Sequence, residues 1–214
     1  LSTALTKLLV RDEAASLTRI ARDALLPIDM VTASALLVAC CRSQLTHHVA
    51  ELVRETHARR LGFDKAALQL AAELLLSQKP PLLEESALTV EALGSAIKAS
   101  GGGSGDLARL TRLQEKLVLA LCAHTKEERA LETLRRGNAH GILPTALALR
   151  SLAEACSRRR ASALLSELVE LLLKLQPRLP PGVFSAATTA CADAGADVNA
   201  IGQATSEAQQ GGGY

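Results

Sequence analysis

The stretch Thr111–Thr145, TRLQEKLVLALCAHTKEERALETLRRGNAHGILPT, decides the fold. Apolar residues recur every three or four positions, first in LQEKLVLALCA and again in ERALETLRR, which is the spacing of amphipathic helices. The segment Gly141–Thr145 carries a glycine and a proline, which are typical of the chain that follows a helix. We therefore expect two helices and a closing turn within these 35 residues.

The same register continues on both sides of this stretch. Small residues stand at the tenth position of successive repeats, 35 residues apart, at Ala120, Ala155 and Ala190. Ala39 precedes Ala120 by 81 residues, which is one repeat of 35 and one of 46. A single helix pair cannot bury its apolar face alone, whereas stacked pairs share a continuous core. The sequence predicts an all-α fold, a right-handed α-solenoid of helix-turn-helix repeats of about 35 residues.

The register divides the chain into one array, which we expect to cover residues 1–214. Its repeats are 1–29 (partial), 30–64, 65–110, 111–145, 146–180 and 181–214 (partial). Repeat 65–110 is 11 residues longer than its neighbours, and its run GGGSG at 101–105 indicates a flexible loop. The chain starts inside a helical pattern without an initiator methionine, so we expect a processed product or the ordered piece of a longer protein.

Some helix ends are also predicted from single residues. In repeat 30–64, Thr46 suits the N-cap of the second helix, and Gly62 suits a left-handed turn after it. In repeat 146–180 we expect the inter-helix turn at 157–162, and Pro177, Pro180 and Pro181 at the end of the repeat. No stretch shows the period-2 alternation of a strand.

The composition bounds the class of protein. Hydrophobic residues make up 48% and charged residues 21%, which allows a sizeable core and excludes simple disorder. Aromatic residues make up 1%, which suits closely packed helices better than a β-sandwich. The net charge of +2 is not that of a strong electrostatic nucleic-acid binder, so any RNA contact would depend on local patches. No apolar run reaches the roughly 20 residues needed to cross a bilayer, so we expect no membrane insertion.

Catalytic and metal chemistry find little support. The sequence lacks HExxH, P-loop, GxSxG and GxGxxG motifs, and its five histidines share no metal-ligand spacing. The odd number and wide spacing of the cysteines argue against a disulfide framework or a zinc site and favour small hydrophobic residues in a reducing compartment. We predict no enzyme, cofactor, metal or small-molecule substrate. The cysteines are Cys40, Cys41, Cys122, Cys156 and Cys191.

Details of the repeat resemble one family. The run Arg129–Leu134, RALETL, and the closing turn Gly141–Thr145, GILPT, are similar to the "A-L-E-L-F" second helix and "G-I-x-P-D" turn of the pentatricopeptide repeat (PPR) family. The Ala-Cys pairs at 39–40, 155–156 and 190–191 resemble the first helix of that family. The resemblance covers most of the chain. It implies an RNA-binding protein of an organelle, whose first helices line a groove for single-stranded RNA.

The resemblance also implies positions of contact. In this family the fifth and last residues of a repeat contact the base, the second packs against it, and a basic residue near the thirteenth meets phosphate. Repeat 30–64 matches this pattern with Val31, Ser34, Arg42 and Asp64, and its fifth and last residues resemble a guanine-preferring pair. A hydroxyl and a carboxylate can accept hydrogen bonds from a base edge.

The other repeats depart from the pattern. Their fifth and last residues are Gln69 with Leu110, Glu115 with Thr145, and Arg150 with Pro180, while the last repeat offers Ser185. Ala123 and Asp193 stand where a basic residue is expected, and Arg158 matches it.

Arginines cluster at three places. The run Arg158–Arg159–Arg160 is expected in an inter-helix turn, Arg135–Arg136 on a second helix and Arg59–Arg60 at the end of another. Phosphate contacts from such arginines give affinity without sequence choice. A solvated face is the alternative interpretation of each cluster.

Two functional hypotheses follow. The first is a PPR-like organellar RNA-binding protein that contacts single-stranded or ribosomal RNA mainly through the backbone, in RNA processing or as a ribosome-associated subunit, with the mitochondrion preferred over the plastid. The alternative is a helical-repeat scaffold that binds protein subunits of a large organellar assembly without base-specific RNA contacts. The RNA-contact candidates are Val31, Ser34, Arg42, Asp64, Gln69, Arg150, Arg158, Arg159, Arg160 and Ser185.

Overall fold

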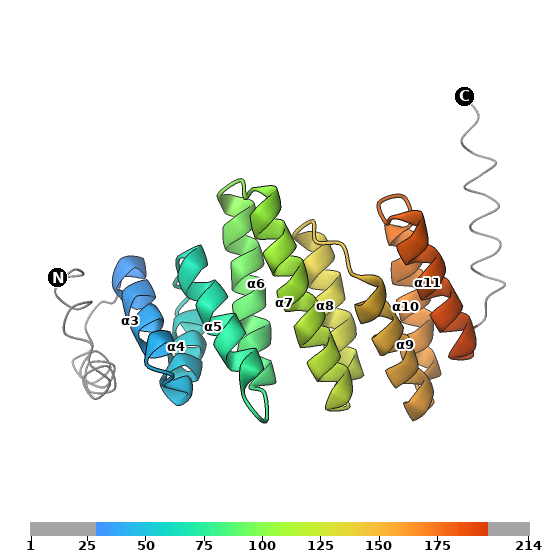
Figure 1. Ribbon diagram of the computed structural model, residues 1–214, viewed down its shortest axis with the longest axis horizontal. Coiled ribbons are helices and arrows are strands. Elements are labelled where there is room, and N and C mark those ends of the chain that lie inside the picture. Colours follow the sequence, from blue (N-terminus) through green and yellow to red (C-terminus); the bar gives the residue numbers. More distant parts are fainter. Residues whose placement is uncertain (1–28, 197–214) are drawn as a thin grey trace. The chain divides into compact units, whose positions relative to one another are not determined.

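The computed structural model describes residues 29–196, and over this range the chain contains nine α-helices and no strand (Figure 1). The all-α helical-repeat prediction is therefore confirmed. The predicted helices of 1–28 and the second helix of the last repeat lie outside the described residues. The right-handed superhelix and the single array over 1–214 stay predictions.

The described helices alternate as first and second helices of the repeats. They are α3 (Met30–Arg42), α4 (Thr46–Ala58), α5 (Lys65–Ser77), α6 (Leu83–Ala99), α7 (Ser104–Ala123), α8 (Glu127–Ala139), α9 (Ala146–Arg159), α10 (Ser162–Leu175) and α11 (Pro181–Asp193). The chain forms two compact units that divide within α7, between Leu113 and Gln114. We call them the N-terminal and the C-terminal subdomain.

The N-terminal subdomain has two helical layers. First helix α3 packs against first helix α5, and second helix α4 packs against second helix α6, while α3 with α4 and α5 with α6 join the layers (Figure 1). Leucines such as Leu37, Leu68 and Leu75 are fully buried between them. Asp29 is the N-cap of α3, because its carboxylate accepts the backbone N–H of Thr32 at 2.7 Å and so satisfies a free donor of the first turn.

The C-terminal subdomain repeats this arrangement. First helix α9 packs against first helix α11, and second helix α8 packs against second helix α10. Its core holds Leu134, Leu152 and Leu168, each at most 1% exposed. Small residues at the tenth position, Ala155 and Ala190, are buried. The equal spacing of apolar residues therefore builds the same two-layer packing in both subdomains.

Several helix ends differ from the predictions. Thr46 is the first residue of α4, whose N-cap is Leu45, so the predicted Thr46 cap is wrong. The left-handed residue after α4 is Arg60, with φ of 56°, and Gly62 does not have a positive φ. Helix α4 ends at Ala58, so the left-handed residue lies two positions before Gly62 in the chain.

Two further boundaries lie elsewhere than expected. Helix α9 continues to Arg159, which leaves a turn at 160–161 instead of 157–162, and Pro181 starts α11 instead of ending the preceding repeat. Proline suits the first helical turn because its missing N–H would have no partner there. The predicted loop 101–105 is shorter, because α7 begins at Ser104.

All five cysteines are buried free thiols. Burial raises the pKa of Cys41 and Cys122 to about 12 and that of Cys156 and Cys191 to about 11. Neutral, buried thiols behave as small hydrophobic groups, as the sequence predicts.

Candidate nucleic-acid interface

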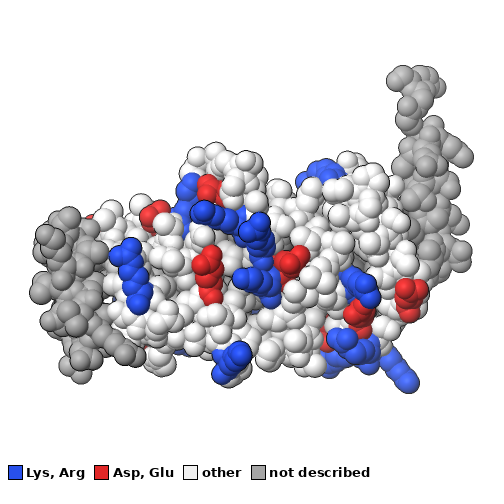
Figure 2. Space-filling view, in the orientation of Figure 1, with Lys and Arg blue, Asp and Glu red and all other residues white. Residues whose placement is uncertain are grey.

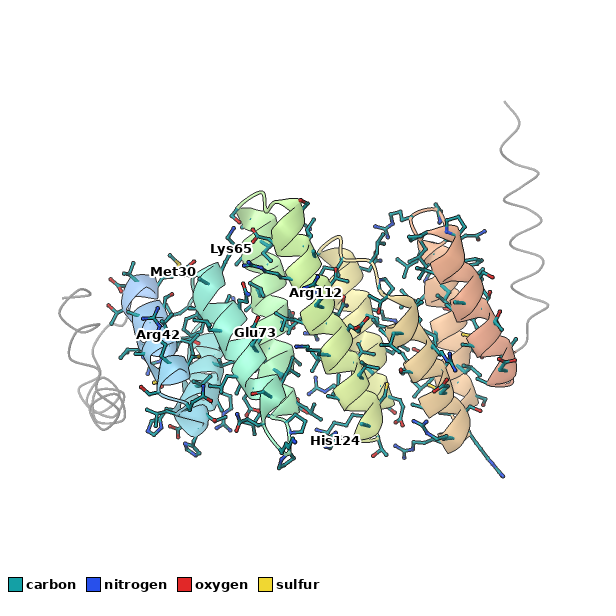
Figure 3. All side chains as sticks on the ribbon, viewed as in Figure 1. Met30, Arg42, Lys65, Glu73, Arg112 and His124 are labelled. Carbon is teal, nitrogen blue, oxygen red and sulfur yellow. The ribbon has the colours of Figure 1, made fainter. Side chains whose placement is uncertain are left out.

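The exposed side of the first helices carries the candidate interface, and we call it the first-helix face of each subdomain. In the N-terminal subdomain, Val31 and Arg42 lie on α3, and both are exposed, Val31 by 55%. Eleven residues advance a helix by three turns to within about 20° and by about 17 Å. The aliphatic side chain and the arginine therefore lie on one face, at opposite ends of α3, with Arg42 at the lower end in Figure 3.

Helix α9 of the C-terminal subdomain carries the equivalent pair. Leu147 is 50% exposed and Arg158 is exposed, again eleven residues apart on one helix. Neither Arg42 nor Arg158 forms an ion pair within residues 29–196. Leu147 was missed by the sequence reasoning, although its place as second residue of repeat 146–180 could have identified it.

The structure brings Ser34 and Asp64 together. The Ser34 hydroxyl oxygen accepts the backbone N–H of Asp64 at 2.8 Å, and Ser34 is only 8% exposed. The Asp64 carboxylate is exposed at the N-terminus of α5 and caps no backbone N–H. Ser34 thus holds the turn into the next repeat, and its contact with a base stays a prediction.

The same two repeat positions meet in the C-terminal subdomain. The Thr145 hydroxyl donates a short hydrogen bond to the Glu115 carboxylate, and its oxygen accepts the N–H of Ala148 at 3.2 Å. In both subdomains the fifth residue of a repeat therefore bonds to the last residue, which is the N-cap of the next first helix. This internal contact competes with any base for the same groups.

Gln69 on α5 is also held by neighbours. Its amide donates to Glu73 at 3.2 Å and accepts from Arg109 at 3.3 Å. Lys65 pairs with Asp106 at 3.0 Å, so the first turns of α7 are fastened to α5. These tertiary contacts explain why Ser104 and Gly105 are helical despite the poor helix propensity of glycine.

Sequence reasoning missed the basic residues around this contact, Lys65, Arg109 and Arg112, because they lie in or beside the long repeat. Arg112 is exposed and forms no ion pair within the described residues. Figure 2 shows basic side chains gathered over α7 on the side that faces the viewer, and Figure 3 labels Arg112 there.

A cleft of about 630 Å³ lies between α9 and α11 in the C-terminal subdomain, and it holds Arg150. Arg150 pairs with Glu154 at 2.7 Å. The hydrogen bond and charge of Glu154, followed by the charge of Asp193, raise the pKa of Arg150. Arg158 lines the same cleft, so two arginines and two carboxylates share it. Figure 2 shows both signs of charge interleaved over α9 and α11.

The other residues of the arginine run have different surroundings. Arg159 pairs with Glu127 at 3.1 Å and donates to the Thr125 carbonyl at 2.9 Å. Glu127 is 5% exposed, so an RNA phosphate would compete with this buried carboxylate for Arg159. Arg160 is exposed and has a left-handed backbone, with φ of 55°.

The predicted Ser185 is exposed, on α11. Its carbonyl accepts the hydroxyls of Thr188 and Thr189, at 2.9 and 3.0 Å. Thr188 and Thr189 also lie on α11. These hydrogen bonds involve the Ser185 backbone, so they leave its side chain at the surface as a candidate.

Arginines on the second helices are paired internally. Arg54 of α4 pairs with Glu85 of α6 at 3.5 Å, and Arg135 of α8, at the same repeat position, pairs with Glu167 of α10 at 2.7 Å. Arg59 and Arg136 pair with carboxylates one turn away on their own helices. The solvated-face interpretation suits these arginines, whereas Arg42, Arg112 and Arg158 on first helices form no ion pair within residues 29–196.

No group of three or more histidine, cysteine, aspartate or glutamate side chains within residues 29–196 is arranged to hold a metal ion. None of the helices described there is long and apolar enough to cross a membrane.

Comparisons with known proteins find likeness among solved structures. No family model matches the chain, and no curated protein matches it. The chain is similar to the crystal structure of the pentatricopeptide repeat protein PPR10 from maize, at 14% sequence identity and a TM-score of 0.33. The match covers 98% of this chain and 33% of the other, so the chain spans about a third of that protein's length.

Proposed function

We propose that this chain is a PPR-like RNA-binding protein that holds single-stranded RNA on its first-helix face, mainly through the sugar-phosphate backbone. The observation that carries the proposal is the repeated pair of an exposed aliphatic residue and an arginine, Val31 with Arg42 and Leu147 with Arg158. An aliphatic side chain offers a surface for a base, and an arginine offers a charge for a phosphate. Both pairs stand at equivalent positions on first helices.

Backbone contact is favoured over base reading because three of the expected base-contacting side chains already have partners. Ser34 accepts the Asp64 N–H, Glu115 accepts the Thr145 hydroxyl, and Gln69 lies between Glu73 and Arg109. Breaking the part-buried hydrogen bonds of Ser34 and Glu115 opposes the gain from a base. An organellar location, with the mitochondrion preferred over the plastid, and a role in RNA processing or on a ribosome follow from the sequence resemblance and belong to the same proposal.

The alternative is a protein–protein scaffold of a large organellar assembly. The carboxylates of Glu73, Glu115, Glu154 and Asp193 on first helices favour it, because they repel phosphate. Net charge near zero agrees with either partner. The two functions differ in a direct measurement, because only the first predicts RNA affinity that falls with salt.

The test measures fluorescence anisotropy of a labelled single-stranded RNA with the full chain at several salt concentrations. We expect binding at low salt, with a slope of log affinity against log salt that decreases by about 1 in Arg42→Ala and in Arg158→Ala, because each removes one phosphate contact. Val31→Ala and Leu147→Ala should weaken binding with an unchanged slope. Absence of binding at low salt would refute the RNA function and favour the scaffold.

Each subdomain offers a matched control. Arg54→Ala and Arg135→Ala remove one positive charge from a second helix, where each arginine already pairs with a glutamate. Their salt slopes should equal that of the unaltered chain. If all four arginine variants lower the slope equally, net charge and not the first-helix face controls the affinity.

A further inference from the structure

The cleft between α9 and α11 contains carboxylates, which phosphate binding does not use. Its volume of about 630 Å³ lies within the range of small-ligand sites. Its charged groups are Arg150, Glu154, Arg158 and Asp193, so the charges cancel. An anion would meet two carboxylates, and a cation would meet two arginines. A neutral ligand with hydrogen-bond donors and acceptors side by side fits this lining best.

The cleft contains Arg150, the fifth residue of repeat 146–180, to which the sequence resemblance assigns base contact, but its other polar groups differ from those that the resemblance assigns. That position pairs Arg150 with Pro180, and proline offers no side-chain hydrogen bond. In the structure Arg150 is instead accompanied by Glu154, one turn further along α9, and by Asp193 from α11. The acceptors in the cleft are therefore Glu154 and Asp193, and Asp193 stands at the thirteenth position of the last repeat, where the resemblance expects a basic residue.

We propose that this cleft binds a guanine base of the RNA, with Asp193 accepting its two neighbouring donors and Arg150 donating to its O6 oxygen. This inference rests on the proposed function. The Watson–Crick edge of guanine presents one acceptor beside two donors, O6, N1–H and N2–H. A carboxylate accepts two parallel N–H groups, and an arginine donates to guanine O6.

The other bases fit less well. Uracil places an acceptor on each side of its single donor, so one of its oxygens would face a carboxylate. Cytosine has one donor beside two acceptors, and adenine has only one donor beside one acceptor. Guanine alone supplies two adjacent donors for the Asp193 carboxylate.

The remaining charged groups have supporting roles. Glu154 is a positioning residue, because its ion pair at 2.7 Å fixes the guanidinium of Arg150. That pair also neutralises Arg150 toward phosphate, which leaves Arg158 as the cation of this cleft that forms no ion pair within residues 29–196. The cleft therefore separates base recognition by Arg150 and Asp193 from backbone contact by Arg158.

The experiment compares labelled oligouridines that carry guanosine, inosine or adenosine at one central position. Inosine lacks only the N2 amino group of guanosine, so it tests the second donor alone. We expect the guanosine oligomer to bind the full chain about tenfold more tightly than the inosine or adenosine oligomer, the discrimination typical of one bidentate contact. Asp193→Asn should remove the preference, because an amide accepts at one atom only.

Glu128→Gln is the matched control. Glu128 is an exposed carboxylate of the same subdomain that lies outside this cleft, so the change in net charge is equal. It should affect all three oligomers alike and keep the guanosine preference. Circular dichroism and thermal unfolding of both variants establish that each is folded, and Asp193 is exposed at the end of α11.

The outcomes separate the two proposals. If no oligomer binds at low salt, the RNA function itself is wrong. If all three bind with equal affinity, RNA binding stands and the guanine site is overturned. If Asp193→Asn changes all affinities equally and as Glu128→Gln does, Asp193 acts only as a negative charge, which also overturns the site.

Discussion

Gly137 of α8 leaves room for the Gln114 side chain of α7, so we predict that alanine at this position destabilises the chain, although glycine disfavours a helix interior. Gln114 of α7 lies over it, only 2% exposed, and its amide donates to the Thr133 carbonyl at 2.9 Å. A Cβ atom at residue 137 would lie 1.9 Å from the Gln114 Nε2 and 2.7 Å from its Cδ. Gly137→Ala therefore forces the Gln114 amide to move.

The magnitude follows from two opposing terms. Alanine gains about 1 kcal/mol over glycine in a helix interior. Moving the amide breaks its hydrogen bond to Thr133 and leaves a buried donor unsatisfied, which costs about 1–3 kcal/mol. Because Gln114 Oε1 already lacks a partner within the described residues, no second bond compensates. We expect Gly137→Ala to lower the free energy of unfolding by up to about 2 kcal/mol, which corresponds to about 2–4 °C in Tm for each kcal/mol.

Thermal unfolding followed by circular dichroism tests this in a double-mutant cycle. In a Gln114→Ala background the clash is absent, so Gly137→Ala should raise stability by up to about 1 kcal/mol. Gly182→Ala on α11, where a Cβ meets nothing within 4 Å, is the control that should not destabilise. The reasoning is refuted if Gly137→Ala has the same effect in both backgrounds.

Three further predictions concern other parts of the structure. Thr125 has a left-handed backbone, with φ of 58°, so Thr125→Gly should raise the free energy of unfolding by about 1 kcal/mol. Gly141 has φ of 80°, so Gly141→Ala should lower the free energy of unfolding by about 1 kcal/mol. Changes of the same sign in thermal unfolding would contradict this reasoning. In denaturant unfolding, Arg159→Ala should lower the free energy of unfolding by about 1–2 kcal/mol because it leaves the buried Glu127 unpaired, a value reduced because the Arg159 side chain is half-exposed. Arg158→Ala should change the free energy of unfolding by less than about 0.5 kcal/mol. The raised thiol pKa values predict that Tm falls as pH rises from about 8.5, the unfolded value, toward 11, because only the unfolded chain loses these protons readily. Thiol alkylation near pH 8.5 should also be far slower in the native than in the unfolded chain, and equal rates would contradict the burial of Cys41, Cys122, Cys156 and Cys191.

Much of the candidate site could be predicted from the sequence. Repeat arithmetic alone placed Val31 and Arg42 on a first helix, and the same arithmetic applied to the second position would have added Leu147. The arginine run at 158–160 could not be sorted in this way. Whether an arginine faces a cleft, a buried carboxylate or solvent depends on a rotation of about 100° per residue and on which helix lies opposite.

The sequence by itself determined the helices, their order and the pairing of first with second helices. Apolar spacing sets which face of each helix is buried, and residues such as Asp29 set helix ends through local hydrogen bonds. These are effects between neighbours in the chain.

Only the tertiary structure decided which polar groups are still available for a partner. The Ser34 hydroxyl is taken by a backbone N–H 30 residues away, Glu127 takes Arg159, and Arg150 meets Asp193 across a cleft. Such contacts depend on the distance and rotation between packed helices, which side-chain volumes at the interface determine and which no spacing in the sequence records.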